Sequence, residues 1–459
     1  MSHTHILVAT FPGQGHINPS LQLAKKLANM GIEVTFMTSV FARKRMANAA
    51  VPNGLTFVDF SDGSDDGLRP GDDRKRYMEE MKISGLKALR NIIQASSERS
   101  RPLTCLVYSH LFAWAAEAAR EFHVPSALLW IEPATVLNIY YYFFNGYDGD
   151  INACTSQIRL PQLPVLSTDD LPVFLLPSTP ERFRLLMKEK LDVLDAETKP
   201  KVLVNSFDEL ETDALRAVEK YELIAVGPLV PSGFLHGEGL SDNSYGGDIF
   251  KLSENDYIEW LNSKPRSSVI YISFGSMFAL SRMQMEEMAK GLLDCGRPFL
   301  WVIRENESDG NEEDGPKWSH FEELERIGKI VTWCSQLEVL SHPSLGCFLT
   351  HCGWNSSLES IVFGIPVVAF PQGFDQPTNA KLIEDVWKTG VRVHKNEDRG
   401  IVESNEIVKC IEEVMDDGEK SKELRKNANK WKGLAREAME ENGSSNKNLK
   451  YFLKELGHV

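Results

Sequence analysis

The first half of the chain alternates short apolar runs with segments of helical hydrophobic spacing. Expected strands at 5–11, 33–38 and 103–108 are separated by such segments, including a helix that we expect to start at Asn18-Pro19 and end at Met30. Short apolar runs between helices are typical of strands buried on both faces of a parallel sheet. The stretch from 140 to 200, rich in aromatic residues and prolines, shows no regular pattern. This half therefore predicts an α/β domain.

A second α/β series follows a segment with the composition of a linker. Gly227-Pro228 precedes a run from 231 to 247 that is rich in Gly, Ser and Asp. Apolar runs then alternate with helical patterns from 269–274 onward, and 404–456 reads as amphipathic helices. The predicted fold is α/β, with two Rossmann-like domains facing each other across a cleft. The expected boundaries are an N-terminal domain at 1–235, a linker at 236–265, a C-terminal domain at 266–440 and a tail at 441–459 that packs back toward the N-terminal domain.

Composition and charge exclude several classes of function. The chain has 459 residues, of which 42% are hydrophobic and 25% charged, close to the average of soluble folded proteins. A formal charge of -15 disfavours nucleic acid and anionic membranes as partners. The N-terminal residues lack the pattern of a signal peptide, and seven dispersed cysteines suggest free thiols. We expect a cytoplasmic protein, a monomer, with no metal site.

The first candidate site follows the first predicted strand. Gly13 and Gly15 allow a tight turn there, and His16 precedes the expected helix start. The partial positive charge at that end disfavours imidazolium, so a neutral His16 is suited to accept a proton from a hydroxyl. The alternative is a surface or capping histidine. The spacing is not a dinucleotide-binding fingerprint, because the third glycine of that motif would fall at Asn18.

Two further candidates lie in the second half. Gly275-Ser276 follows a predicted strand and offers backbone amides to a phosphate, although this signal is weak. His351, Asn355 and Ser356 follow another strand, at the expected start of a helix whose free amides suit a diphosphate. Ser356 and Glu359 also match a helix capping box, which would explain this pair without a ligand.

The 44 residues from Trp333 to Gln376 resemble the donor-binding box of plant family-1 UDP-glycosyltransferases. Gly15-His16, Phe274-Gly275-Ser276 and the overall length agree, so the resemblance covers essentially the whole chain. Within the family, the sequence is most similar to the group that contains anthocyanin 5-O-glucosyltransferases and some ester-forming glucosyltransferases. The resemblance implies a GT-B fold, an acceptor-binding N-terminal domain and a UDP-sugar-binding C-terminal domain.

The resemblance also implies roles for the donor-binding residues. Trp333 would stack on the uracil, Cys334 and Gln336 would contact base and ribose, and Glu359 would accept hydrogen bonds from the ribose. The diphosphate and sugar contacts would come from Ser276, His351, Gly353, Trp354, Asn355, Ser356, Asp375 and Gln376. In the family, Gln at the last position of the box goes with glucose, so Gln376 favours UDP-glucose. His16 would be the general base of an inverting displacement that needs no metal or other cofactor.

Two departures from the family pattern stand out. Many members carry an aspartate after the strand at 103–108 to orient the histidine, where this chain reads Tyr108-Ser109-His110. Either Ser109 polarises His16, or Glu132 replaces the carboxylate, or the acceptors are acidic enough to need little help. In addition, many members carry tryptophan where this chain has Gly373, with Phe374 beside it, which weakens the inference of donor choice from Gln376.

The acceptor is the least constrained part of the interpretation. Gly15, Trp130, Tyr141 and Phe174 are candidates for the acceptor pocket, with a plain packing role as the alternative. We expect transfer to a hydroxyl of a flavonoid or anthocyanin, with glucose ester formation on a carboxylate as the rival. From other classes, a UDP-sugar epimerase, a non-catalytic UDP-sugar-binding protein and, more weakly, a nicotinamide oxidoreductase remain open.

Overall fold

A computed structural model describes residues 4–46, 52–68, 71–98, 101–153, 157–231, 233, 256–304 and 320–457. The chain divides into two compact units. Unit 1 comprises Met1–Val165, Phe174–Ile249 and Glu437–Val459, and unit 2 comprises Leu166–Val173 and Phe250–Arg436. Residues 236–255 of the expected linker lie outside the described residues, and the rest of it contains a helix, α8 (Asp256–Asn262).

Unit 1 is built on a seven-stranded parallel sheet with strand order β3-β2-β1-β4-β5-β6-β7. Its strands are β1 (His5–Ala9), β2 (Glu33–Ser39), β3 (Leu55–Phe60), β4 (Cys105–Ser109), β5 (Ser126–Trp130), β6 (Lys201–Val204) and β7 (Glu222–Ala225). The order reverses between β1 and β4, so their carboxyl ends flank a topological switch point. Open α/β sheets bind ligands at such points.

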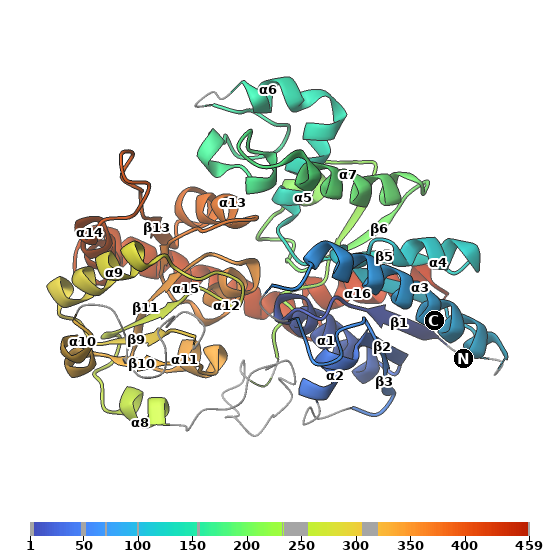
Figure 1. Cartoon of the computed structure of the whole chain (residues 1–459), viewed down its shortest axis with the longest axis horizontal. Helices are drawn as coiled ribbons and strands as arrows, with labels where there is room; N and C mark the ends of the chain where they lie inside the picture. The colour runs from blue at the N-terminus through green and yellow to red at the C-terminus, as the bar shows by residue number, and fades with distance from the viewer. Residues whose placement is uncertain are drawn as a thin grey trace. The chain divides into compact units, whose positions relative to one another are not determined.

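Helices accompany this sheet as expected for parallel strands joined by crossovers. They are α1 (Gln14–Asn29), α2 (Val40–Arg45), α3 (Arg74–Glu98), α4 (Ala115–Glu121), α5 (Ala134–Tyr142), α6 (Asp148–Asn152), α7 (Glu181–Asp195) and α16 (Ser444–Glu455). Figure 1 shows α16, red, among the blue and teal elements of unit 1. It contacts β7 and adds Leu449, Phe452 and Leu453 to the apolar core of that unit.

Unit 2 repeats the design with a six-stranded parallel sheet of order β10-β9-β8-β11-β12-β13. Its strands are β8 (Val269–Ser273), β9 (Phe299–Val302), β10 (Lys329–Val331), β11 (Leu345–Thr350), β12 (Val367–Ala369) and β13 (Gly390–Arg392). Its helices are α8 (Asp256–Asn262), α9 (Arg282–Cys295), α10 (Phe321–Ile327), α11 (Gln336–Ser341), α12 (Trp354–Phe363), α13 (Gln376–Lys381), α14 (Ser404–Met415) and α15 (Glu419–Met439), the last almost entirely in this unit. The switch point here lies between β8 and β11. The α/β prediction with two Rossmann-like domains is thus confirmed.

A short segment from the first half of the sequence belongs to unit 2. Arg392 Nη1 donates to Asp170 Oδ1 at 2.7 Å, and Thr378 Oγ1 donates to the Asp170 carbonyl at 2.6 Å. Val173 N also donates to the Phe374 carbonyl at 2.8 Å. These bonds hold 166–173 against α13 and β13, an arrangement that sequence patterns do not reveal.

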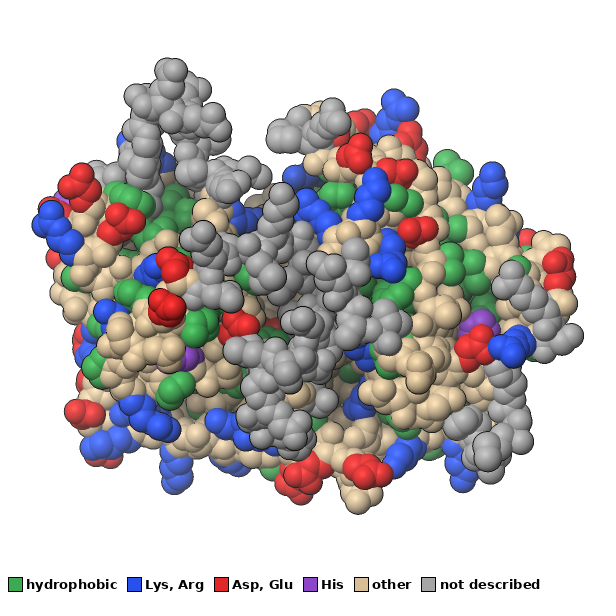
Figure 2. Space-filling view, turned by 90° about the horizontal axis from the view of Figure 1, so that it is seen from below, with side chains coloured by type: hydrophobic (Ala, Val, Ile, Leu, Met, Phe, Trp, Pro, Cys, Tyr) green, Lys and Arg blue, Asp and Glu red, His purple; other side chains and the backbone are tan. Residues whose placement is uncertain are grey.

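Charged side chains of both signs are interspersed over the coloured parts of the face in Figure 2. This mixture accompanies the net negative charge of the chain. Among the described residues, no helix is both long and apolar enough to cross a membrane.

Candidate functional site

His16 lies in the first turn of α1, which starts four residues before the expected position. Gly13 caps the helix in an extended conformation, and its carbonyl accepts from His16 N at 2.9 Å. Pro19 lies inside the helix. Gly13, and not Asn18, provides the turn into the helix, which then continues through Pro19 with the loss of one backbone hydrogen bond. The expected start at Asn18-Pro19 was therefore wrong.

The His16 ring is packed among aromatic and imidazole rings at the switch point of unit 1. Its centroid lies 4.7 Å from that of His110 and 5.2 Å from that of Phe11. His16 Nδ1 is buried and has no hydrogen-bond partner among the described residues. Burial, assisted by the charge of Lys190, lowers the pKa of His16 to about 3. The imidazole is therefore neutral at physiological pH.

His110 and Glu132 extend this cluster from the neighbouring strand ends. His110 follows β4, Glu132 follows β5, and the two strands are paired in parallel. His110 Nε2 lies 3.6 Å from Glu132 Oε1. Burial, followed by the charges of Lys190 and His16, lowers the pKa of His110 well below its usual value. Ser109, by contrast, uses its hydroxyl to accept a hydrogen bond from Phe11 N at 3.1 Å.

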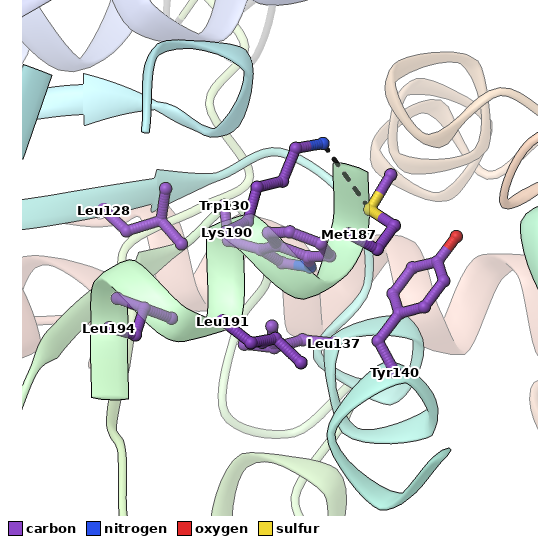
Figure 3. A pocket seen from close by; sticks show the side chains of 8 residues that line it. All are labelled: Leu128, Trp130, Leu137, Tyr140, Met187, Lys190, Leu191 and Leu194. Atoms are coloured by element: carbon purple, nitrogen blue, oxygen red, sulfur yellow. Dashed lines mark hydrogen bonds between the residues drawn. The ribbon is translucent and has the colours of Figure 1, made fainter. Parts of the chain in front are cut away.

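A buried lysine from α7 completes the charged groups near His16. The Lys190 side chain is 5% exposed, and its ammonium donates to Met187 Sδ at 3.5 Å. Burial lowers the pKa of Lys190 to about 8, against the opposing effect of Glu132 and Glu189. Lys190 also lines a pocket of about 230 Å³, part of it open to solvent, which Figure 3 shows together with its dashed bond to Met187. The other lining residues are apolar or aromatic: Leu128, Trp130, Leu137, Tyr140, Met187, Leu191 and Leu194.

The candidates for the acceptor pocket are placed differently from one another. Gly15 is exposed beside His16 on α1, and the Trp130 ring lies 5.2 Å from that of His110. Trp130 Nε1 donates to the Pro133 carbonyl at 2.9 Å. Tyr141 packs against Tyr142 and Tyr221, whereas Phe174 stacks on Phe183 at 5.1 Å. The ring contact with His110 brings Trp130 into the His16 cluster, Gly15 is its neighbour only in sequence, and the ring contacts of Tyr141 and Phe174 are packing contacts.

In unit 2, His351 lies between two glycines at the switch point. A Cβ atom on Gly275, after β8, would lie 2.6 Å from His351 Nε2, and one on Gly353 would lie 2.5 Å from it. Both positions therefore require glycine. Burial lowers the pKa of His351 to about 4, although a hydrogen bond to the Ser273 backbone opposes the shift. A neutral His351 thus lies against Gly275 and the start of α12, an arrangement of backbone amides and an imidazole suited to an anion.

Hydrogen bonds between α11 and α12 connect three of the expected donor-binding residues, and Tyr271 of β8 links Cys334 to them. Gln336 Nε2 lies 2.6 Å from Glu359 Oε2 and 3.0 Å from Ser356 Oγ. The Tyr271 hydroxyl donates to Gln336 Oε1 at 3.3 Å and lies 3.5 Å from Cys334 Sγ. The Trp333 side chain, just before them, is half-buried. Gly353 caps α12 without a side-chain bond. The Ser356–Glu359 pair therefore does not form a capping box.

The last residues of the box are oriented by local hydrogen bonds. Gln376 Oε1 accepts from the backbone amides of Gln372 at 2.8 Å and Gly373 at 2.9 Å. This arrangement leaves the amide nitrogen of Gln376 as the available donor group. Asp375 Oδ2 accepts from Asn379 Nδ2 at 2.7 Å, and burial raises the pKa of Asp375 to about 6. Trp354 is buried, and Asn355 is half-buried beside it on α12.

Phe278 lies beside the unusual Gly373. A Cβ atom on Gly373 would lie 2.9 Å from the Phe278 ring, and that ring packs edge-on against Phe374 at 5.1 Å. Arg304 Nη2 donates to the Phe278 carbonyl and its Nη1 to the Ser276 carbonyl. Phe278 therefore fills the space directly over residue 373.

Three residues of these sites were not identified from the sequence: His110, Lys190 and Phe278. His110 was noted only as part of the segment that lacks aspartate. Lys190 lies on α7, whose buried Met187, Leu191 and Leu194 recur at helical spacing that the surrounding prolines obscured. Phe278 carries no sequence signal, since its role depends on the space left by Gly373. Among the described residues, no cluster of histidine, cysteine or acidic side chains is arranged to hold a metal.

Comparison with known proteins identifies the family. Residues 249–429 match the model of the family described as UDP-glucoronosyl and UDP-glucosyl transferase. Two similar relatives are the anthocyanidin 3-O-glucoside 5-O-glucosyltransferase of Verbena hybrida, 64% identical over 99% of both chains, and anthocyanidin 3-O-glucoside 5-O-glucosyltransferase 1 of Perilla frutescens, 61% identical over 100% of both.

A solved structure agrees over the same length. Os79 from O. sativa, in complex with UDP, is 32% identical, with a TM-score of 0.84 over 98% of this chain and 100% of that one. The expected family, its GT-B fold and its enzymatic class are thereby confirmed. The chain belongs to the plant family-1 UDP-glycosyltransferases, near the anthocyanin 5-O-glucosyltransferases, and is a glycosyltransferase.

Proposed function

We propose that the protein transfers glucose from UDP-glucose, with inversion, to a hydroxyl of a small aromatic plant metabolite of the flavonoid or anthocyanin type. The observation that carries this proposal is the bonded set Gln336–Ser356–Glu359 next to His351, which matches the donor-binding box. The acceptor class rests on the relatives from Verbena and Perilla, and on phloretin 4'-O-glucosyltransferase of Malus domestica, 54% identical over 99% of this chain.

The donor would be bound by groups of complementary chemistry along unit 2. Trp333 and Cys334 would hold the uracil, and Glu359 would accept hydrogen bonds from the ribose. Ser276, His351, Asn355 and Ser356 would surround the diphosphate at the start of α12, where free amides and the helix dipole favour an anion. His351 is neutral and donates one N–H, so it adds no full positive charge.

The sugar would be recognised by the end of the box. Because two backbone amides occupy Gln376 Oε1, its amide nitrogen is left to donate to a sugar hydroxyl. Asp375, steadied by Asn379, would accept from neighbouring hydroxyls, and Trp354 would pack beside them. This orientation supports selection of a hexose with hydroxyls in the arrangement of glucose.

His16 would act as the general base. As the acceptor oxygen bonds to the anomeric carbon, its proton passes to His16, and the bond from that carbon to UDP breaks with its electron pair leaving on the diphosphate. Attack opposite to the leaving group inverts the configuration. A low pKa keeps His16 neutral and able to accept the proton.

The test is a turnover assay by mass spectrometry with UDP-glucose and a panel of anthocyanins, flavonols, simple phenols and aromatic acids. We expect alkali-stable glucosides, lost in His16→Ala while UDP binding persists. Alkali-labile esters that survive His16→Ala would favour the carboxylate alternative. UDP binding without any product would favour a non-catalytic UDP-sugar-binding protein, and conversion of UDP-glucose without an acceptor would indicate an epimerase.

The cellular setting forms part of the same proposal. The six cysteines among the described residues are free thiols, which supports a reducing compartment, and we propose the cytoplasm. The crocetin glucosyltransferase of Gardenia jasminoides, 57% identical, is called chloroplastic, so imaging of a fluorescent fusion should include both compartments. We propose a monomer, which light scattering of the purified protein tests directly.

A further inference from the structure

The general base proposed for this protein lacks an obvious partner. His16 is buried enough that its protonated form is strongly disfavoured, so it needs a compensating negative charge when it accepts a proton. Ser109, the last residue of β4, is uncharged, and its hydroxyl is engaged with Phe11 N. The compensating group must therefore come from another element.

The geometry of unit 1 provides a chain of groups that ends on a carboxylate. The His16 and His110 rings are 4.7 Å apart, centre to centre, and tilted by 46°. Both Nδ1 atoms are buried without a hydrogen-bond partner among the described residues, so a small ring rotation can let one donate to the other. On the far side of His110, its Nε2 lies 3.6 Å from Glu132 Oε1.

We propose that His110 and Glu132 are positioning residues for His16, forming a His16–His110–Glu132 relay that takes the place of a carboxylate in direct contact with the base. This inference rests on His16 acting as the base. His110 transmits the effect because both of its nitrogens are used: Nδ1 accepts from His16 Nδ1–H, and Nε2–H donates to Glu132. His16 then presents Nε2, without a hydrogen, to the acceptor hydroxyl.

The proton balance of the relay is simple. The acceptor O–H bond breaks, and its proton forms a new N–H bond at His16 Nε2. The resulting imidazolium donates to His110, and the positive charge is offset by the Glu132 carboxylate without a further net transfer. The proton returns to bulk solvent after product release.

Lys190 places a positive charge near the relay. It is the cation near the two histidines, and it disfavours their protonated forms while attracting Glu132. Lys190 and Glu132 thus attract each other, and the Glu132 carboxylate also lies beside His110. Removing Glu132 leaves the lysine charge uncompensated, so His16 becomes a weaker base.

The test compares Glu132→Gln and His110→Asn in the full chain, using UDP-glucose and phenols of graded acidity. We expect kcat to fall roughly tenfold to a hundredfold for weakly acidic phenols, part of the usual contribution of general base catalysis, and less for acidic ones. KM for UDP-glucose should stay unchanged. Matched controls are Glu197→Gln, a half-buried carboxylate bonded to Ser126 Oγ, and His123→Asn at an exposed position, and both should leave kcat unchanged.

A rescue experiment separates positioning from structural damage. Ser109→Asp places a carboxylate next to the strand end, and it should restore kcat when combined with Glu132→Gln or His110→Asn. If Glu132→Gln and His110→Asn both kept the wild-type kcat while His16→Ala lost activity, the relay would be overturned and the proposed base would stand. Full activity in His16→Ala would instead overturn the proposed base.

A measurement independent of turnover is the tautomer of His16, observed by NMR with ¹⁵N-labelled histidine. We expect the proton on Nδ1 in the wild type and a change of the His16 signals in Glu132→Gln but not in Glu197→Gln. An Nε2-protonated His16 in the wild type would overturn the relay even if no acceptor had been found.

Discussion

Gln336 on α11 donates to the Glu359 carboxylate on α12 at 2.6 Å, so the acid that would bind the ribose is held in place before the donor arrives. The same amide nitrogen lies 3.0 Å from Ser356 Oγ, which we propose to contact the diphosphate. One side chain thus bonds both to the residue proposed for the ribose and to one proposed for the diphosphate.

From this relationship we predict that Gln336→Leu raises KM for UDP-glucose roughly tenfold to a hundredfold, since a hydrogen bond to a charged group contributes about 1.5–3 kcal/mol. kcat at saturating donor should change little, because the chemistry of His16 is untouched. Steady-state kinetics measures both. Glu338→Gln on the same helix keeps an acceptor for the Tyr257 hydroxyl and should leave KM unchanged. An unaltered KM in Gln336→Leu would mean that Glu359 needs no support.

Gly275→Ala should weaken donor binding. The loss should be larger than backbone strain alone would cause. Its φ of +71° disfavours alanine, and the added Cβ would lie 2.6 Å from His351 Nε2. Gly296→Ala is the matched control, with φ +64° and no atom within 4 Å of the added Cβ. Both variants should lose about 1–2 kcal/mol of stability. Calorimetric titration with UDP should show weakened binding only in Gly275→Ala, and equal binding in both would contradict the role of His351.

Gly373→Trp should destabilise unit 2 and lower turnover, although many family members carry tryptophan at this position. The added side chain meets the Phe278 ring, 2.9 Å from the position of Cβ. The double variant Phe278→Ala/Gly373→Trp should recover stability and show altered preference between UDP-glucose and UDP-galactose. Melting temperatures and donor competition assays measure these effects. Normal stability of the single variant would show that Phe278 moves aside freely.

The titration of His16 should lack the usual signature of histidine. Because the pKa of His16 is lowered to about 3, the base is neutral at every pH above that value, and its proton-accepting form is lost only as the pH falls toward 3. Because burial raises the pKa of Asp375 to about 6, the check is made on the His16 ring itself: its ¹⁵N NMR signals should show no titration near pH 6.5 between pH 5.5 and 8. In Lys190→Met the pKa of His16 should rise, because a nearby positive charge is removed. The neutral form of His16 should then be lost at a higher pH than in the wild type. A wild-type midpoint near 6.5 would refute the buried neutral base.

Periodicity alone identified most elements of this protein. The expected strands at 33–38 and 269–274 became β2 and β8 nearly residue for residue. Strand β8, buried on both faces, is almost continuously apolar, whereas β2 buries Thr35, Thr38 and Ser39 beside its apolar residues. Periodicity placed the start of α1 wrongly, because Gly13 and not Asn18 caps the helix. It also missed α7, because prolines lie on either side of that helix.

The sequence by itself also determined the family, because the 44 residues from Trp333 to Gln376 carry its motif residues at fixed spacing, and it supplied the candidates for donor binding. Only the tertiary structure decided which strand ends are neighbours: β1 beside β4, and β8 beside β11. Those pairings bring His16 to His110 and Gly275 to His351, over separations in sequence that no local pattern spans. The partner of the base and the packing over Gly373 depend on such long-range contacts, since burial and charge are properties of the folded neighbourhood.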